Sequence, residues 1–305
     1  MQIAVSAEYV SAASDGSGSG GVTVSSQTVT ASVHPVCWYM EGLSGAETAD
    51  WLDSPGGAAS DVYHRNNNNS DPKALEEQKA RYPDYESHAD DTEGHWYVAT
   101  CSSEYMADDD PRDFYDVIQD HIVSHPPVWV PAGQAAPEPV IDGATLARAA
   151  WDAVTIPTAT IGYNPTVGDM QATVVGMDTW IWATGDTPKE AVVTATAGPV
   201  TATITATASR LTLQPKDGTA TCTGFGIPWT QDNDSKGTDC VIVFDRSSAH
   251  FKDAVTPVDV KVSYAITYTA TDGATGTMNT HTTTTTTNIP VAEIQAINTR
   301  TTKEP

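Results

Sequence analysis

The chain has 305 residues, a net charge of −24, and 39% hydrophobic but only 18% charged residues. This length corresponds to about two domains and is sufficient to bury a core. Strong acidity repels phosphate groups, so it argues against binding to nucleic acid or to an anionic membrane surface. No run of about 18 apolar residues occurs, which argues against insertion into a membrane.

The acidic residues are concentrated in the first half of the chain. Residues 1–140 contain 23 acidic and 5 basic residues, whereas residues 141–305 contain 16 and 10. The simplest interpretation is that the acidity keeps the protein soluble, and binding of a cation or a basic partner is the alternative. Much of the polar remainder is Thr, Ser, Asn and Gly, which is typical of β-rich extracellular proteins.

Residues 1–35 predict an N-terminal arm that is either flexible or strand-like. The segment SDGSGSGG at 14–21 has the composition of a flexible linker. The sequences on either side of it alternate between apolar and polar residues, as strands do. A poorly ordered tail and an arm that pairs with a neighbouring sheet are therefore the two alternatives.

Residues 36–140 form an acidic region with repeated helix start signals. Ser44 and Glu47 have the spacing of a capping box. The pair Asp71-Pro72 combines a capping residue with a proline in the first helical turn, and Asp110-Pro111 repeats this signal. Three helices are therefore predicted, each starting at one of these signals.

Two extended segments are predicted in the same region. GHWYVATC at 94–101 follows a turn signal and is rich in aromatic and β-branched residues, so it predicts a strand. PPVWVPAGQAAPEP at 126–139 predicts an extended connector, because its prolines are incompatible with a helix interior.

A connecting helix is predicted within residues 141–162, capped by Asp142 and closed by Pro157. From residue 163 to about 300 the pattern changes to alternation of β-branched and polar residues with short turns between segments. About seven such segments without intervening helices predict an antiparallel sandwich. The expected fold class is α+β, in which an irregular, disulfide-bonded α/β region at 36–140 precedes an immunoglobulin-like β-sandwich.

Four cysteines are present, Cys37, Cys101, Cys222 and Cys240. An even number in a chain of this composition indicates two disulfides. Four cysteines allow three pairings, and the change in composition near residue 140 favours Cys37–Cys101 and Cys222–Cys240. No CxxC spacing occurs, which argues against a zinc site.

Several short segments occur in a fixed order within residues 34–299: CWYMEG, GHWYVATC, PPVWVPAGQ, TLARAAWDAVTIP, TWIWAT, TCTGFGIPW and VAEIQAINT. Together they resemble a group of actinobacterial secreted proteins of unknown function that end in a PKD-like, immunoglobulin-like sandwich. The resemblance implies an exported protein with a cysteine pair in each half, and it implies no catalytic residue. LTLQPKDGTATC replaces the aromatic-Asp-x-Gly-Asp-Gly turn of that group, so no calcium or glycan role of the turn is carried over.

An acidic cluster offers the one candidate metal site, formed by Asp108, Asp109, Asp110 and Asp113. Carboxylate oxygens are suitable ligands for Ca²⁺, although the spacing is not that of an EF-hand loop. A helix start explains the same residues, because the positive end of the helix dipole favours acidic side chains. Calcium is therefore the only candidate cofactor, and no cofactor is the simpler expectation.

Few other residues suggest catalysis. His121 and His125 can share one face of a helix, but the zincin motif needs a glutamate after the first histidine, so surface or packing roles are predicted. No GxSxG sequence is present to place a nucleophile on a strand–helix turn. A hydrolase would have to use two carboxyl groups of the acidic half, brought together by the fold.

Trp180 and Trp182 lie one residue apart in a predicted strand, so both indoles point to the same face. Both faces of this strand are largely apolar, as expected for a central strand that is covered on each side. The pair is predicted as a packing anchor between the two halves of the chain. A platform for stacking a ligand is the alternative.

The favoured function is that of a secreted or cell-surface, non-enzymatic structural or binding protein, as a subunit of an extracellular assembly. Its expected partners are other protein subunits or cell-surface glycans. One alternative is an adhesin for carbohydrate or the cell wall that uses aromatic side chains such as Trp38, Tyr39 and Trp229. The other is a hydrolase with its site in the acidic half.

Overall fold

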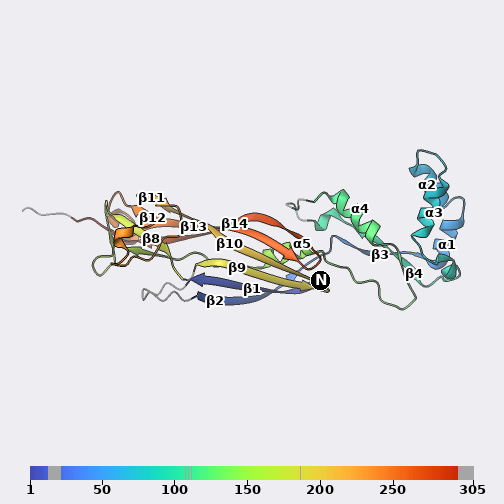
Figure 1. Cartoon of the computed structure of the whole chain (residues 1–305), viewed down its shortest axis with the longest axis horizontal. Coiled ribbons are helices and arrows are strands. Elements are labelled where there is room, and N and C mark those ends of the chain that lie inside the picture. Colours follow the sequence, from blue (N-terminus) through green and yellow to red (C-terminus); the bar gives the residue numbers. More distant parts are fainter. Residues whose placement is uncertain (13–21, 107, 109, 111, 186, 295–305) are drawn as a thin grey trace, which may run out of the picture. The chain divides into compact units, whose positions relative to one another are not determined.

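The computed structural model describes residues 1–12, 22–106, 108, 110, 112–185 and 187–294. The chain divides into two compact units, whose elements are labelled in Figure 1. The first unit comprises Met1–Ile3, Ser32–Ala149 and Thr196–Thr201, and the second comprises the remaining described residues. The whole linker-like segment 14–21 and the end of the chain after residue 294 lie outside the described residues.

A three-stranded antiparallel sheet of order β3-β4-β5 organises the first unit. Its strands are β3 (Cys37–Ser44), β4 (His95–Cys101) and β5 (Val128–Val130). Cys37 and Cys101 lie opposite each other in the β3–β4 register and form a disulfide. The predicted strand at 94–101 is therefore confirmed, and the proline-rich connector contributes the short β5.

Two helix start signals act as predicted. Helix α1 (Gly45–Asp53) begins with a complete capping box, in which Glu47 N donates to Ser44 Oγ at 3.2 Å and Ser44 N donates to Glu47 Oε2 at 2.9 Å. Helix α3 (Pro72–Ala80) begins where Ala74 N donates to Asp71 Oδ1 at 3.1 Å. Helix α2 (Ala58–Arg65) was not predicted, because its first turn has no side-chain cap that a sequence pattern could show.

These helices enclose the core of the first unit with strand β4. Its buried members are Ala49, Leu52, Ala58, Tyr85 and Trp96. The His88 ring stacks on Trp129 with a centroid distance of 4.1 Å, and Trp129 lies beside Trp96 at 5.6 Å. Gly94 is required at its position, because a Cβ there would lie 2.4 Å from the Trp129 ring.

Helix α4 (Phe114–Ser124) begins later than the signal Asp110-Pro111 indicates. Tyr115 N donates to Asp113 Oδ1 at 2.8 Å, so Asp113 is the capping residue and the predicted start at Asp110 is wrong. Asp110 instead forms ion pairs with two arginines. Helix α5 (Gly143–Ala153) is capped by Asp142 as predicted but ends four residues before Pro157.

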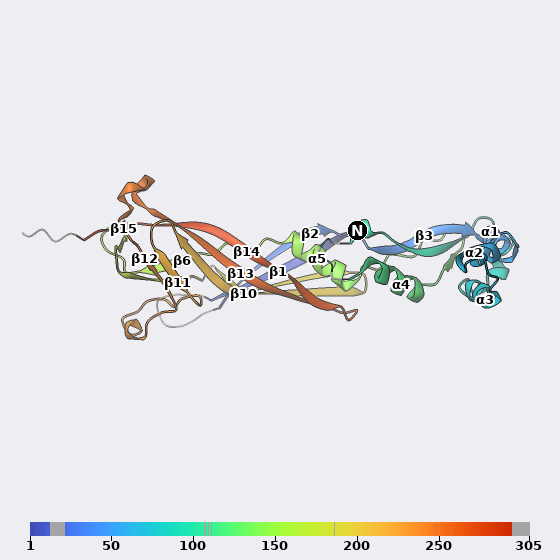
Figure 2. The ribbon, with the colours of Figure 1, turned by 90° about the horizontal axis from the view of Figure 1, so that it is seen from above.

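A six-stranded sheet of order β14-β13-β10-β9-β1-β2 dominates the second unit (Figures 1 and 2). Its strands are β1 (Gln2–Ala12), β2 (Val22–Ser32), β9 (Pro188–Ala197), β10 (Val200–Pro215), β13 (Thr256–Ala270) and β14 (Thr275–Ile289). Of the two alternatives for the N-terminal arm, the structure has the strands. β1 pairs with β9 of the same chain, with Val5 opposite Ala195.

Alternation along the long strands builds the core of this unit. In β13 the side chains at every second position from Thr256 to Tyr268 are buried, whereas the intervening ones are half-buried or exposed. β1 shows the same pattern from Ile3 to Tyr9. One face of the sheet is therefore apolar and the other is polar and largely open.

Two smaller sheets complete the second unit. One has the order β11-β12-β8-β6, with β6 (Ile161–Asn164), β8 (Asp178–Ala183), β11 (Thr219–Cys222) and β12 (Cys240–Val243). The other pairs β7 (Thr173–Val174) with β15 (Val291–Ala292) in parallel. Cys222 and Cys240 lie opposite each other in β11 and β12 and form the second disulfide, so both predicted disulfide pairings are confirmed.

The chain therefore consists mainly of antiparallel sheets in a sandwich-like arrangement, with helices concentrated in the acidic region. This agrees with the predicted α+β class at the level of element types and disulfides. In the part of the chain that the structure describes, no helix combines the length and the hydropathy needed to span a membrane.

Candidate functional site

The six-stranded sheet ends in two open edge strands. Within the described residues, β2 and β14 each have a neighbouring strand on one side only. Natural edge strands usually avoid pairing with other chains by being short or by carrying charges or proline. β2 and β14 have 11 and 15 residues and contain no Asp, Glu, Lys, Arg or Pro, so they lack these protections.

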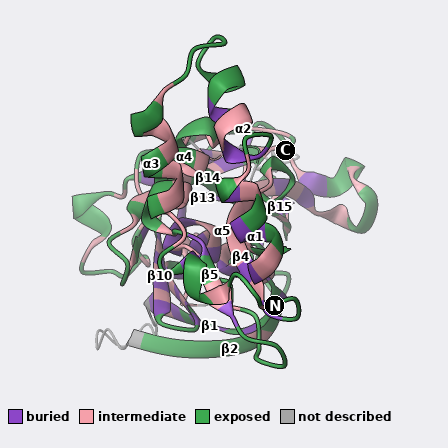
Figure 3. Ribbon diagram, turned by 90° about the vertical axis from the view of Figure 1, so that its right-hand side faces the viewer, coloured by how far each residue is buried: buried purple, intermediate pink, exposed green. Residues whose placement is uncertain are grey.

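The first half of strand β2 is exposed on both faces (Figure 3), whereas Ala31 near its end is buried. The side chain of Val24 is 61% exposed, and the residues from Thr23 to Thr28 are all exposed. Apart from pairing with β1, β2 is held by a hydrogen bond from Tyr9 Oη to Gln27 Oε1 at 3.1 Å. Because it buries so little surface in its own chain, a further strand on its outer side would add the contacts it lacks.

The six-stranded sheet carries few charged residues, and their charges cancel. The six strands contain three acidic and three basic residues, namely Glu8, Glu190, Asp259, Lys189, Arg210 and Lys261. The net charge of −24 therefore lies outside this sheet. Two copies of the chain would repel each other over most of their surfaces, and least where these uncharged edges meet.

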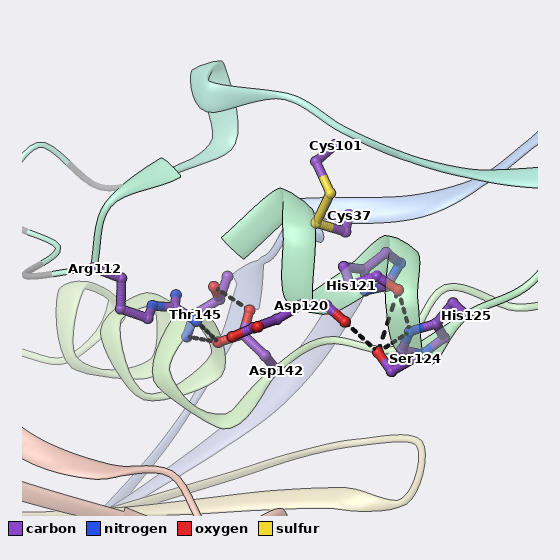
Figure 4. Close-up of a disulfide and its surroundings, with 9 residues drawn as sticks. All are labelled: Cys37, Cys101, Arg112, Asp120, His121, Ser124, His125, Asp142 and Thr145. Carbon is purple, nitrogen blue, oxygen red and sulfur yellow. Dashed lines mark hydrogen bonds and ion pairs between the residues drawn. A yellow bond between two sulfur atoms is a disulfide. The ribbon is translucent and has the colours of Figure 1, made fainter. Parts of the chain in front are cut away.

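A groove of about 430 Å³ along α4 is the second candidate site, and it lies within the first unit. Figure 4 shows His121 and Ser124 in the last turn of α4, His125 directly after it, and Asp142 with Thr145 at the start of α5. Four aspartates line the groove: Asp113, Asp116, Asp120 and Asp142.

Two of the four aspartates, Asp142 and Asp113, are engaged by the protein itself. Asp142 accepts hydrogen bonds from Thr145 N at 3.1 Å and Thr145 Oγ1 at 2.7 Å, and it pairs with Arg112 at 3.1 Å. Asp113 caps α4. Among the described residues, no group of three or more His, Cys, Asp or Glu side chains is placed to hold a metal ion. The geometry of the groove thus corresponds to helix capping and ion pairing.

The cluster predicted to bind calcium is divided between several roles. The side chain of Asp110 is only 2% exposed and pairs with Arg112 Nη2 at 2.7 Å and Arg148 Nη1 at 3.0 Å. Asp113 caps α4, and Asp108 is exposed. Asp109 lies outside the described residues, so the calcium site stays a prediction.

His121 is a strongly perturbed titratable group of the groove. Its ring stacks on His125 with a centroid distance of 3.9 Å, and its Nε2 atom is buried without a hydrogen-bond partner in the structure described. Burial and, to a smaller extent, the neighbouring His125 lower the pKa of His121 to about 4, while Asp142 acts in the opposite direction. The neutral imidazole is therefore the form that the fold accommodates.

This pKa predicts an acid-sensitive element in the first unit. An unfolded histidine binds a proton near pH 6.5, whereas folded His121 does so only near pH 4, so the unfolding free energy should fall as the pH drops between these values. His121→Phe should remove this part of the pH dependence. Chemical denaturation followed from pH 7 to pH 4 measures it, and parallel curves for the variant and the wild type would contradict the assignment.

The carboxyl groups give no support to a hydrolase pair. Such a pair needs one acid whose pKa is raised. Five carboxyl groups of the described residues instead have a lowered pKa, because hydrogen bonds and ion pairs outweigh burial. These groups are Glu47, Asp53, Asp91, Asp110 and Asp217.

The three aromatic residues predicted to bind glycans have different surroundings, and their role in glycan binding stays a prediction. Trp38 and Tyr39 are consecutive in β3, so their side chains point to opposite faces of the sheet. Tyr39 Oη donates to the carbonyl of Pro126 at 3.0 Å, and the Trp38 ring packs edge-on against Tyr105. Trp229 belongs to the second unit, is 38% exposed, and donates from Nε1 to Asp234 Oδ1 at 2.8 Å.

Trp180 and Trp182 lie in β8, which is an inner strand of the four-stranded sheet between β12 and β6. Trp180 is buried, with 8% exposure, and Trp182 is half-buried. The Trp182 ring packs over Gly162 of β6, where a Cβ would approach it to 2.5 Å. The indoles thus pack within the second unit, and a role as an anchor between the two halves stays a prediction.

Comparison of the chain with models of protein families, with curated proteins and with solved structures finds no match. The sequence pattern had indicated strands on both sides of the linker, but not that β2 would end a sheet. The sequence feature that points to these edges is the absence of charged residues from two strand-like segments of a strongly acidic chain.

Proposed function

We propose that the chain is an exported, non-enzymatic structural protein that assembles with other protein subunits outside the cell. The observation that carries the proposal is the pair of long, uncharged edge strands, β2 and β14, in a chain of net charge −24. A sheet with such edges is a template for adding further strands, which is the main hazard that soluble monomers avoid. In an assembly subunit the same edges are the contact surface.

The disulfides support export. Cross-links such as Cys37–Cys101 and Cys222–Cys240 persist in oxidising surroundings and are rare in the reducing cytosol. The sandwich-like arrangement and the cysteine pair in each unit also fit the resemblance to actinobacterial secreted proteins with a PKD-like, immunoglobulin-like domain. We include that domain type and that origin in the proposal.

Self-association should increase with salt if this proposal is correct. Two acidic copies repel each other, and raising the ionic strength from about 0.01 M to about 0.15 M shortens the screening length from about 30 Å to about 8 Å. The uncharged edges lose nothing by this screening. Size-exclusion chromatography with light scattering, and electron microscopy of the same samples, should therefore show larger species at the higher salt.

A chain that stays monomeric at every salt and protein concentration would remove the assembly proposal. Species that grow as salt is lowered would also count against it, because they would indicate contacts between charged surfaces.

A further inference from the structure

The direction of the strands determines how two copies can join. β1 with β9, β10 with β13, and β13 with β14 are antiparallel pairs. β9 and β10 are joined by a two-residue loop at Gly198 and Pro199, with Thr196 Oγ1 and Thr201 Oγ1 2.9 Å apart across the hairpin, so they are antiparallel as well.

The remaining pair, β1 with β2, follows from three hydrogen bonds. Met1 N donates to Val33 O at 2.7 Å, Val33 N donates to Met1 O at 2.9 Å, and Thr23 Oγ1 donates to Ser11 O at 3.4 Å. Met1, directly before β1, therefore lies beside Val33, directly after β2, and Ser11 near the end of β1 lies beside Thr23 near the start of β2. Both contacts fit the same antiparallel register. β1 and β2 are therefore antiparallel.

A sheet of six antiparallel strands has edges that run in opposite directions. A second copy in the same orientation therefore presents its β14 antiparallel to β2 of the first copy. The joined sheet continues the alternation without interruption, and each added copy again leaves one β2 and one β14 open. This contact is head-to-tail, so it is not limited to two copies unless the rotation between copies closes a ring.

The composition of the edges suits this contact. Nine of the fifteen residues of β14 are threonine, and β2 is composed of Thr, Ser, Val, Gln and Ala. Thr–Thr and Thr–Ser pairs on facing strands are favourable, and no like charges would meet across the new pair. Among the described residues, both edges belong to the second unit except for Ser32 at the end of β2, so the contact needs no assumption about the first unit.

We propose that β2 of one copy pairs antiparallel with β14 of the next copy, which makes the assembly a head-to-tail continuation of the six-stranded sheet. This inference depends on the proposed function and specifies its partner as a second copy of the chain. It predicts two different contact surfaces, β2 and β14, and both are necessary for the head-to-tail contact.

The hydrogen-bond pattern indicates where to block each edge. Met1 and Val33 exchange two backbone hydrogen bonds, so the backbone N–H and C=O groups of Val33 point toward β1. Backbone groups alternate in direction along a strand, so those of Thr28, five positions earlier, point away from β1. In the turn between β13 and β14, Ala270 N donates to Ala274 O and Gly273 N donates to Ala270 O. Alternation from Ala274 along β14 then leaves Thr277 N pointing outward. Proline at either position removes an outward N–H and spares the ladder within the chain.

The test uses two variants, Thr28→Pro and Thr277→Pro, separately and mixed. Each alone should associate at least about tenfold more weakly than the wild type, since only one of its edges remains competent. The mixture combines an open β14 from the first variant with an open β2 from the second. It should form a 1:1 dimer and no larger species, measured by light scattering of copies that differ by a mass tag.

Thr28→Val and Thr277→Val are the matched controls, because valine keeps the N–H and the β-branched shape, and they should assemble like the wild type. Circular dichroism checks that the proline variants are folded, and a variant that unfolds is replaced by proline at Ser26 or Thr275, which are also outward. The inference would be overturned if either proline variant associated as strongly as the wild type, or if the mixture stayed monomeric. Either result would leave the proposed function standing. Absence of wild-type association would instead refute the proposed function.

Discussion

Replacing Cys37 and Cys101 together by serine is expected to lower the free energy of unfolding of the first unit by about 4 kcal/mol. The bridge joins residues separated by 64 positions, so it removes a large loop-closure entropy from the unfolded chain. The closed loop contains α1, α2 and α3 and most of the aromatic core of this unit. Its loss would leave β3 and β4 to pair across a long flexible segment.

The second bridge provides the matched comparison. Cys222 and Cys240 are separated by 18 positions, so the same double substitution should cost about 3 kcal/mol and should act on the second unit. Urea denaturation gives both values, and amide hydrogen exchange assigns each to its unit. A larger cost for the shorter loop, or protection lost in the opposite unit, would show that the loop-closure argument does not apply.

The elements that could be predicted from sequence are those with a local cause. The capping box of Ser44 and Glu47 and the pair Asp71-Pro72 contain their whole mechanism within four residues. The same holds for the alternation in β13, which depends only on the two-residue period of a strand. Such signals do not require knowledge of the rest of the fold.

Asp110 shows why other elements could not be predicted. Its sequence context is as good a helix start as that of Asp71, but the partner that engages it, Arg148, is 38 residues away. An ion pair of two arginines with a buried carboxylate is stronger than one cap bond, so the helix begins at Asp113 instead. Only the tertiary structure makes this competition visible.

The candidate interface has the same limitation. The alternation in residues 22–32 predicts a strand, but its neighbours are chosen by long-range pairing that no local pattern reports. Because β1 pairs with β9, β2 is the last strand of the sheet, and its lack of charge then indicates an edge that can pair with another chain. The chemistry of the edge was thus readable from sequence, whereas its position as an edge was not.

Asp110→Ala is expected to destabilise the first unit by about 3–5 kcal/mol, because it leaves two guanidinium groups without their shared carboxylate. In the wild type, burial tends to raise the pKa of Asp110, but hydrogen bonds from Arg112 and the charges of Arg112 and Arg148 outweigh it and hold that pKa below its usual value. Arg112 also reaches Asp142, the cap of α5, at 3.1 Å. The substitution therefore weakens the segment before α4 and the start of α5 together.

Denaturation at several pH values separates this ion pairing from a simple loss of packing. A carboxylate with a lowered pKa stabilises the fold above its unfolded pKa of about 4, and this contribution disappears as the pH falls through the folded value. The difference between the wild type and Asp110→Ala should thus be constant from pH 5 to pH 7 and should shrink below about pH 4. Asp108→Ala is the matched control, because this exposed aspartate lies two positions away and its loss should change stability by less than about 0.5 kcal/mol. Equal costs for the two substitutions would mean that the buried carboxylate contributes no more than an exposed one.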